Sequence, residues 1–165
     1  MRIRELQEGE WPLWRDLAIA AATDSPDAFR PTAEDHLAST DEMWIDLIES
    51  TVKHPRGGLW IAETGDDAVG MLFARVDASY EVAEVGAMWV APDNRDAGVG
   101  SALLAAAKHW ALSQGAHVME LWVTEGNSAA VSLYNRKGFT DTEETQFLRD
   151  GCPLIVRKMR VSLTT

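Results

Sequence analysis

A loop between two apolar segments holds the residues with the clearest chemical potential. Arg95 is followed at short spacing by Gly98 and Gly100, and an Ala/Leu-rich segment begins directly after them. A helix beginning here would present unpaired N–H groups and the positive end of its dipole to the loop. Glycines let an anion approach the backbone closely, and a guanidinium can bind two phosphate oxygens at once. The spacing therefore predicts a phosphate-binding loop.

This loop departs from the two common nucleotide-binding patterns. A P-loop needs a lysine directly after its last glycine, and Ser101 follows Gly100 here. A dinucleotide-binding fingerprint needs a glycine or alanine three residues after Gly100, where Leu103 stands. A glycine-rich turn that precedes a helix and binds nothing is the structural alternative, and the loop alone leaves it open.

A second segment, Asn127 to Phe139, reads NSAAVSLYNRKGF. The Arg-x-x-Gly-x-Gly pattern at 95–100 resembles the acyl-CoA pyrophosphate loop of the GNAT superfamily of N-acetyltransferases, and 127–139 resembles that superfamily's other signature. The two segments stand in the same order and at a similar distance as in that superfamily. The resemblance implies an acetyl-CoA-dependent N-acetyltransferase, with acetyl-CoA as co-substrate, in which a primary amine attacks the thioester directly.

The resemblance also implies which residues bind acetyl-CoA. Backbone N–H groups of the loop would bind the pyrophosphate, and the strand before the loop would pair with the pantetheine arm. Gly86 lies in that strand, where a glycine often marks a bulge, although the sequence does not place the bulge. Asn127 would contact the pantetheine or orient a water, and it could equally be a plain helix N-cap. The implied set is Met88, Trp89, Val90, Arg95, Asp96, Ala97, Gly98, Val99, Gly100, Ser101, Asn127 and Tyr134.

Two residues are candidates for proton transfer. Tyr134 matches the superfamily tyrosine that reaches the coenzyme sulfur, so it would act as general acid toward the leaving thiolate. A core tyrosine on an amphipathic helix is the alternative. Glu84 lies on the strand before the loop, where several GNAT members place a glutamate that deprotonates the amine through water. A solvated carboxylate is the alternative there, because Glu81 is near and ordered water alone serves many members.

The flanking segments predict a mixed α/β (α+β) fold in a single domain over 1–165. We expect one mostly antiparallel sheet with helices on both faces. Hydrophobic periodicity and turn residues give the order strand, helix, helix, three strands, helix, strand, helix, two strands. The expected helices begin near Trp11 and Asp41 and span 98–114 and 127–138, and the expected strands include 59–63, 68–76, 82–90 and 118–123. The tryptophans expected in the core are Trp14, Trp44, Trp60 and Trp122.

Composition narrows the function classes. The net charge of −11, from 15 basic and 26 acidic residues, argues against nucleic acid or an anionic membrane as a partner. No apolar run reaches the ~20 residues of a membrane span, and the first residues do not resemble a signal peptide. One cysteine excludes an internal disulfide, so we expect a cytoplasmic protein. The four histidines lack metal-ligand spacing, so we expect no metal.

Acidic residues are frequent in 23–45, the segment that the resemblance identifies as the variable substrate cover. This distribution predicts a small cationic amine as acceptor. A non-catalytic acyl-CoA-binding or regulatory domain and a protein N-terminal acetyltransferase are the alternatives, and a homodimer is a further expectation from this fold. The acidic residues are Asp24, Asp27, Glu34, Asp35, Asp41 and Glu42.

Overall fold

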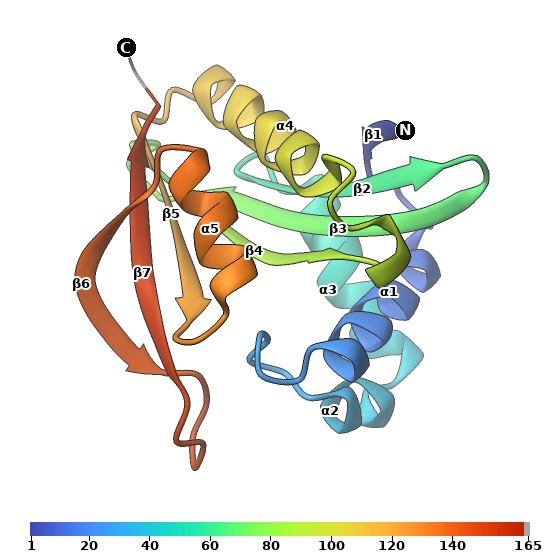
Figure 1. Cartoon of the computed structure of the whole chain (residues 1–165). Coiled ribbons are helices and arrows are strands. Elements are labelled where there is room, and N and C mark those ends of the chain that lie inside the picture. Colours follow the sequence, from blue (N-terminus) through green and yellow to red (C-terminus); the bar gives the residue numbers. More distant parts are fainter. Residues whose placement is uncertain (164–165) are drawn as a thin grey trace.

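A seven-stranded mixed sheet forms the frame of the molecule (Figure 1). The computed structural model describes residues 1–163. The strand order is β1-β2-β3-β4-β5-β7-β6, and every neighbouring pair is antiparallel except β4 and β5. The strands are β1 (Arg2–Glu5), β2 (Gly57–Thr64), β3 (Asp67–Val76), β4 (Val82–Val90), β5 (Val118–Thr124), β6 (Thr140–Phe147) and β7 (Ile155–Ser162).

Helices cover both faces of the sheet, which confirms the expected architecture. Helices α4 (Val99–Ser113) and α5 (Ser128–Arg136) pack on one face over a core that includes Leu103 and Phe139. Helices α1 (Trp11–Asp24) and α3 (Asp41–Lys53) pack on the other face, over a second core that includes Trp14. The short α2 (Ala33–Ala38) joins them, and a 3-10 turn, η1 (Pro92–Asn94), follows β4.

Three local features differ from the sequence prediction. The sequence analysis did not predict helix α2. A capping box marks the start of this helix: Thr32 Oγ1 accepts from the Asp35 N–H, and the Asp35 carboxylate accepts from the Thr32 N–H. Strand β2 begins at Gly57, two residues before the start of the expected strand 59–63. Trp122 is half-buried rather than in the core, because its side chain lines a cavity.

Strands β4 and β5 separate, and this separation creates the central opening of the fold. They pair only from Val82–Val85 with Val118–Leu121, and then diverge (Figure 1). A bulge in β4 lies at the point of divergence, because Met71 pairs with Trp89 whereas Phe73 pairs with Gly86. The left-handed residue of this bulge is Ala87, with a φ of 50°, rather than Gly86. The bulge bends β4 and leaves its edge toward β5 unpaired beyond Val85.

Within the described residues, no helix is long and apolar enough to cross a membrane. The same part of the chain holds no group of three or more His, Cys, Asp or Glu residues arranged to bind a metal ion.

Candidate active site

The loop between η1 and α4 presents backbone N–H groups, as the sequence predicts. Gly98 is the N-cap residue of α4, and no side chain caps this helix end. Asp96 and Gly98 both have left-handed conformations, with φ of 61° and 82°. Left-handed residues in a turn before a helix can direct successive N–H groups toward one point, which is the backbone geometry of a concave anion site. The positive end of the α4 dipole adds to it.

The two glycines of this loop are needed for different structural reasons. A Cβ on Gly98 would meet nothing within 4 Å, so Gly98 is needed for its left-handed backbone. A Cβ on Gly100 would lie 3.0 Å from Met88 Cε and 3.1 Å from Leu133 Cδ2. Gly100 therefore lets α4 pack closely against β4 and α5. The sequence interpretation, in which both glycines only admit an anion, is incomplete for Gly100.

Arg95 is held by the protein itself. Its Nε donates to the Val90 carbonyl at 3.0 Å, and its Nη2 donates to Asp24 Oδ2 at 2.5 Å. The same Asp24 oxygen accepts from Trp89 Nε1 at 3.0 Å. Hydrogen bonds from Trp89, Ser25 and Arg95, in that order, lower the pKa of Asp24 to about 2. Asp24 therefore links the end of α1 to β4 and to the loop before α4.

An inner cavity of about 90 Å³ lies between the separated strands β4 and β5. Tyr134 lines it, is 8% exposed and donates from its hydroxyl to Met88 Sδ at 3.7 Å. Burial raises the pKa of Tyr134 to about 12, so the phenol keeps its proton at neutral pH. A thioether is a weak acceptor, so this hydroxyl can give its hydrogen bond to another group at little cost. Tyr134 belongs to the core and also reaches a cavity.

Asn127 is the N-cap residue of α5, which is one of the two roles that the sequence leaves open to it. Its side chain accepts from the Ala130 N–H at 3.3 Å, so it caps α5. It also lines the inner cavity together with Thr124 and Tyr134. The cap orients the Asn127 amide beside the opening between β4 and β5.

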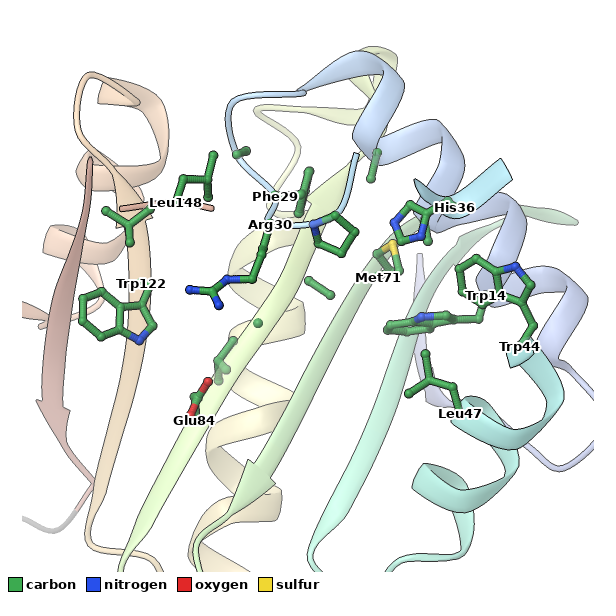
Figure 2. A pocket seen from close by; sticks show the side chains of 18 of the residues that line it. Trp14, Phe29, Arg30, His36, Trp44, Leu47, Met71, Glu84, Trp122 and Leu148 are labelled. Atoms are coloured by element: carbon green, nitrogen blue, oxygen red, sulfur yellow. The ribbon is translucent and has the colours of Figure 1, made fainter. Parts of the chain in front are cut away.

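A larger outer cavity of about 290 Å³ adjoins the inner one (Figure 2). Both cavities share the bulge segment 85–87, the residues Ala28 and Phe29, and Trp122. The walls of the outer cavity come from α1, α2, α3, β3, β4, β5, β6, β7 and the loops before α2 and after β6, and most of the lining residues are apolar or aromatic. The larger apolar residues of the lining are Trp14, Phe29, Trp44, Leu47, Met71, Val85, Trp122, Leu148 and Val156.

Glu84 lies in the outer cavity, whereas Tyr134 lies in the inner one. The Glu84 carboxylate is 3.4 Å from Arg75 Nη2, and its side chain is 44% exposed. Glu84 also lines a surface groove beside β3 and α3, so solvent reaches it. The structure therefore places the two sequence-predicted proton-transfer residues in two adjoining cavities that share the β4 bulge.

The acidic residues of 23–45 do not line the outer cavity. Asp24 is paired with Arg95, Asp35 caps α2, and Asp41 Oδ1 lies 3.7 Å from Arg15. The cationic acceptor that these residues predict therefore has no support from the cavity lining and stays a prediction, because these carboxylates serve the fold or face solvent. The sequence analysis missed Arg30, which lines the cavity and carries no recognisable pattern.

Comparison with known proteins agrees with this geometry. Residues 6–139 match the model of the Acetyltransferase (GNAT) family. A mycothiol acetyltransferase from Thermobispora bispora is 32% identical over 146 residues, which are 85% of this chain and 46% of that protein. The chain spans less than half the length of the curated relatives it matches.

Solved structures share the fold. An acetyltransferase of the GNAT family from Streptococcus pneumoniae superimposes with a TM-score of 0.82 at 20% identity, and 98% of each chain is covered. The yncA protein of Salmonella typhimurium, solved with acetyl-CoA, gives a TM-score of 0.78 at 20% identity, with coverage of 100% of this chain and 95% of that chain. At this identity, the likeness concerns the fold alone.

Proposed function

Because the chain belongs to the GNAT acetyltransferase family, we propose that it transfers the acetyl group of acetyl-CoA to a primary amine of a small molecule. One observation carries this proposal: the buried hydroxyl of Tyr134 reaches a cavity between the separated strands β4 and β5. A helix N-terminus without a capping side chain lies at the end of the same strand β4. The two features together suit a thioester that carries a pyrophosphate, because one can bind the phosphates and the other can reach the sulfur.

The coenzyme would be bound by backbone groups. The loop N–H groups of 96–101 would bind the pyrophosphate, with Arg95 beside them. The pantetheine arm would pair with the edge of β4 at 88–90, which has no partner strand there. Asn127, already oriented as the α5 cap, would contact the arm from the opposite wall. A free strand edge binds an extended amide chain through main-chain hydrogen bonds.

The acetyl transfer would proceed by direct attack. The amine nitrogen forms a bond to the thioester carbon, the carbon–sulfur bond breaks, and the sulfur departs with the electron pair. Glu84 would accept the proton of the amine through water. The pKa of Tyr134, about 12, exceeds the roughly 8.5 of an ordinary thiol. We therefore expect Tyr134 to stabilise the departing sulfur by a hydrogen bond more than by complete proton transfer.

The outer cavity favours a small acceptor over a protein terminus. Its volume of about 290 Å³ is near the lower end of ligand pockets, which hold roughly 300–1,000 Å³. Helices α1 to α3 cover one side of the sheet at this place (Figure 1).

The test is the release of free CoA thiol from acetyl-CoA in the presence of a panel of small amines, with peptides bearing free N-termini in parallel. Release with small amines supports the proposal. Stabilisation by acetyl-CoA without release for any acceptor would instead favour the non-catalytic acyl-CoA-binding domain, and release with peptides alone would favour a protein N-terminal acetyltransferase.

A further inference from the structure

We infer that the acceptor amine carries an apolar or aromatic body and a carboxylate, and that Arg30 binds this carboxylate. This inference rests on the proposed function, because it takes the outer cavity as the acceptor site. Arg30 would then determine specificity within that site.

The charges of the outer cavity differ from those of the whole chain. The chain carries −11, yet the lining contains one carboxylate, Glu84, and one guanidinium, Arg30. His36 also lines the cavity, and burial lowers its pKa, so it is neutral at neutral pH. The lining is therefore balanced, with one cationic and one anionic side chain. An acceptor with one positive and one negative group matches this balance, whereas a dication does not.

Arg30 has no partner among the residues that the structure describes. Within residues 1–163 it makes no hydrogen bond and no ion pair, and this includes Glu84 in the same cavity. Other arginines of the chain, such as Arg4 and Arg157, are paired with carboxylates. Figure 2 shows the Arg30 side chain extending from its loop toward Trp122 and Glu84. A guanidinium in this position offers a planar set of donors that a carboxylate can accept in pairs.

The backbone that carries Arg30 is fixed from two sides. Arg149 donates to the carbonyls of Phe29 at 2.9 Å and Pro26 at 3.1 Å. Thr124 Oγ1 donates to the Asp27 carbonyl at 2.6 Å. These bonds join the loop to β5 and to the segment after β6. A ligand-binding side chain loses less entropy on binding when its backbone is already positioned.

The remaining walls suit an apolar body. Trp14, Trp44 and Trp122 line the cavity from three different elements, and Met71 lies in the same cavity (Figure 2). An aromatic or branched aliphatic group would bury its surface against them. Tryptophan faces can also bind an ammonium group, but a second ammonium in this cavity would be repelled by Arg30. The amine to be acetylated would lie on the Glu84 side.

The inference can be tested by calorimetric titration of the protein in saturating CoA. The ligands are phenylalanine, 2-phenylethylamine, which differs only by lacking the carboxylate, and 1,4-diaminobutane. We expect phenylalanine to bind roughly 10- to 100-fold more tightly than 2-phenylethylamine, because a paired charged hydrogen bond is lost. Arg30→Gln should remove this difference and leave the affinity for 2-phenylethylamine unchanged. Arg2→Gln, at an exposed arginine of β1, is the matched control and should change neither affinity.

Equal affinities for the two aromatic amines, a preference for the diamine, or no saturable binding of any of the three would overturn the inference. Release of CoA from acetyl-CoA, measured in the presence of each of the same three amines, tests the proposed function separately. Release with the opposite preference overturns the inference and leaves the acetyltransferase standing. Carboxylate-dependent binding without release supports Arg30 as the binding residue and overturns acetyl transfer to these three amines.

Discussion

Arg95 and Asp24, which are 71 residues apart in the chain, form a hydrogen-bonded ion pair of 2.5 Å. The same carboxylate oxygen accepts from Trp89 Nε1. The helix that covers the outer cavity is thus tied to the strand and loop that we assign to the coenzyme. The sequence analysis assigned Asp24 to the substrate cover, but its carboxylate positions the side chains of Arg95 and Trp89.

The first prediction concerns acid stability. The pKa of Asp24 falls from its ordinary 3.8 to about 2 in the folded chain. A depressed carboxyl pKa stabilises the fold above the unfolded pKa, and this contribution disappears as the pH falls through the folded value. Asp24→Asn should therefore lower the free energy of unfolding by roughly 1 kcal/mol at pH 7, a modest value because both partners remain partly exposed. The deficit should shrink between about pH 4 and pH 2, as denaturant titrations at several pH values would reveal.

Asp16→Asn is the control, because Asp16 pairs with Arg15 of the same helix and is well exposed. It should change stability by a few tenths of a kcal/mol at most. If the loss of unfolding free energy in Asp24→Asn did not depend on pH, the charge of the Asp24 carboxylate would not stabilise the fold.

The second prediction separates the conformation of the anion loop from its packing. Gly98→Ala puts a Cβ into open space but forces a left-handed backbone, at a cost of about 1–2 kcal/mol. Gly65→Ala in the β2–β3 hairpin does the same at a φ of 62° with nothing nearby. Both variants should therefore lose similar stability. Only Gly98→Ala should reduce the thermal stabilisation by acetyl-CoA, measured as a shift in Tm. An equal shift in both variants would show that the loop does not bind the coenzyme.

The third prediction concerns the hydroxyl of Tyr134. Tyr134→Phe keeps the ring that packs on Phe139 at 5.8 Å and removes only the donor. We expect kcat to fall by about 10²–10⁴, with little change in coenzyme affinity. Tyr80→Phe, at the other tyrosine of the chain, 39% exposed, should leave kcat unchanged. If kcat were unaffected in Tyr134→Phe while chemistry limits the rate, Tyr134 would be a packing residue.

The fourth prediction follows from the raised pKa of the same phenol. Burial raises the pKa of Tyr134 from 10.0 to about 12. A raised folded pKa leaves its stabilising contribution intact below pH 10, and the contribution is lost as the pH rises through 12. Between pH 9 and pH 11.5 the wild-type chain should lose more unfolding free energy than Tyr134→Phe. Parallel slopes for the two proteins would contradict the burial of an ionisable hydroxyl.

The fifth prediction concerns the proton acceptor. Glu84→Gln keeps the shape of the side chain and removes its basicity, so kcat/KM should fall by roughly 10². In both proteins, kcat/KM should rise with pH as the amine substrate loses its proton, and the variant should stay below the wild type. Glu81→Gln changes an exposed carboxylate near the start of the same strand and should have little effect. A Glu84→Gln profile that overlays the wild type would leave proton removal to water alone.

Local chemistry made much of this molecule predictable. A left-handed glycine before an apolar helix is recognisable from neighbouring residues, and so the loop of Gly98 and the start of α4 follow from the sequence. The α5 cap at Asn127 is a local signal of the same kind. The alternation of apolar residues likewise indicates the strands, because burial of one face needs a period of two. Helix α2 carried such a signal as well, in its capping box.

The cavities depended on contacts between distant segments. The bulge lies at Ala87 and not at Gly86 because the register of β4 against β3 decides where the extra residue falls, and local propensity does not. The sequence pattern places Trp122 in the core because it is a large apolar residue in a strand. The separation of β5 from β4 instead leaves its ring beside a cavity. Arg30 and Asp24 lie in one polar segment, yet Arg30 lines the cavity and pairs with none of the described residues, whereas Asp24 is bound to Arg95. Tertiary packing decided between these roles, because the partner of a charged side chain is set by which chain segments meet in space.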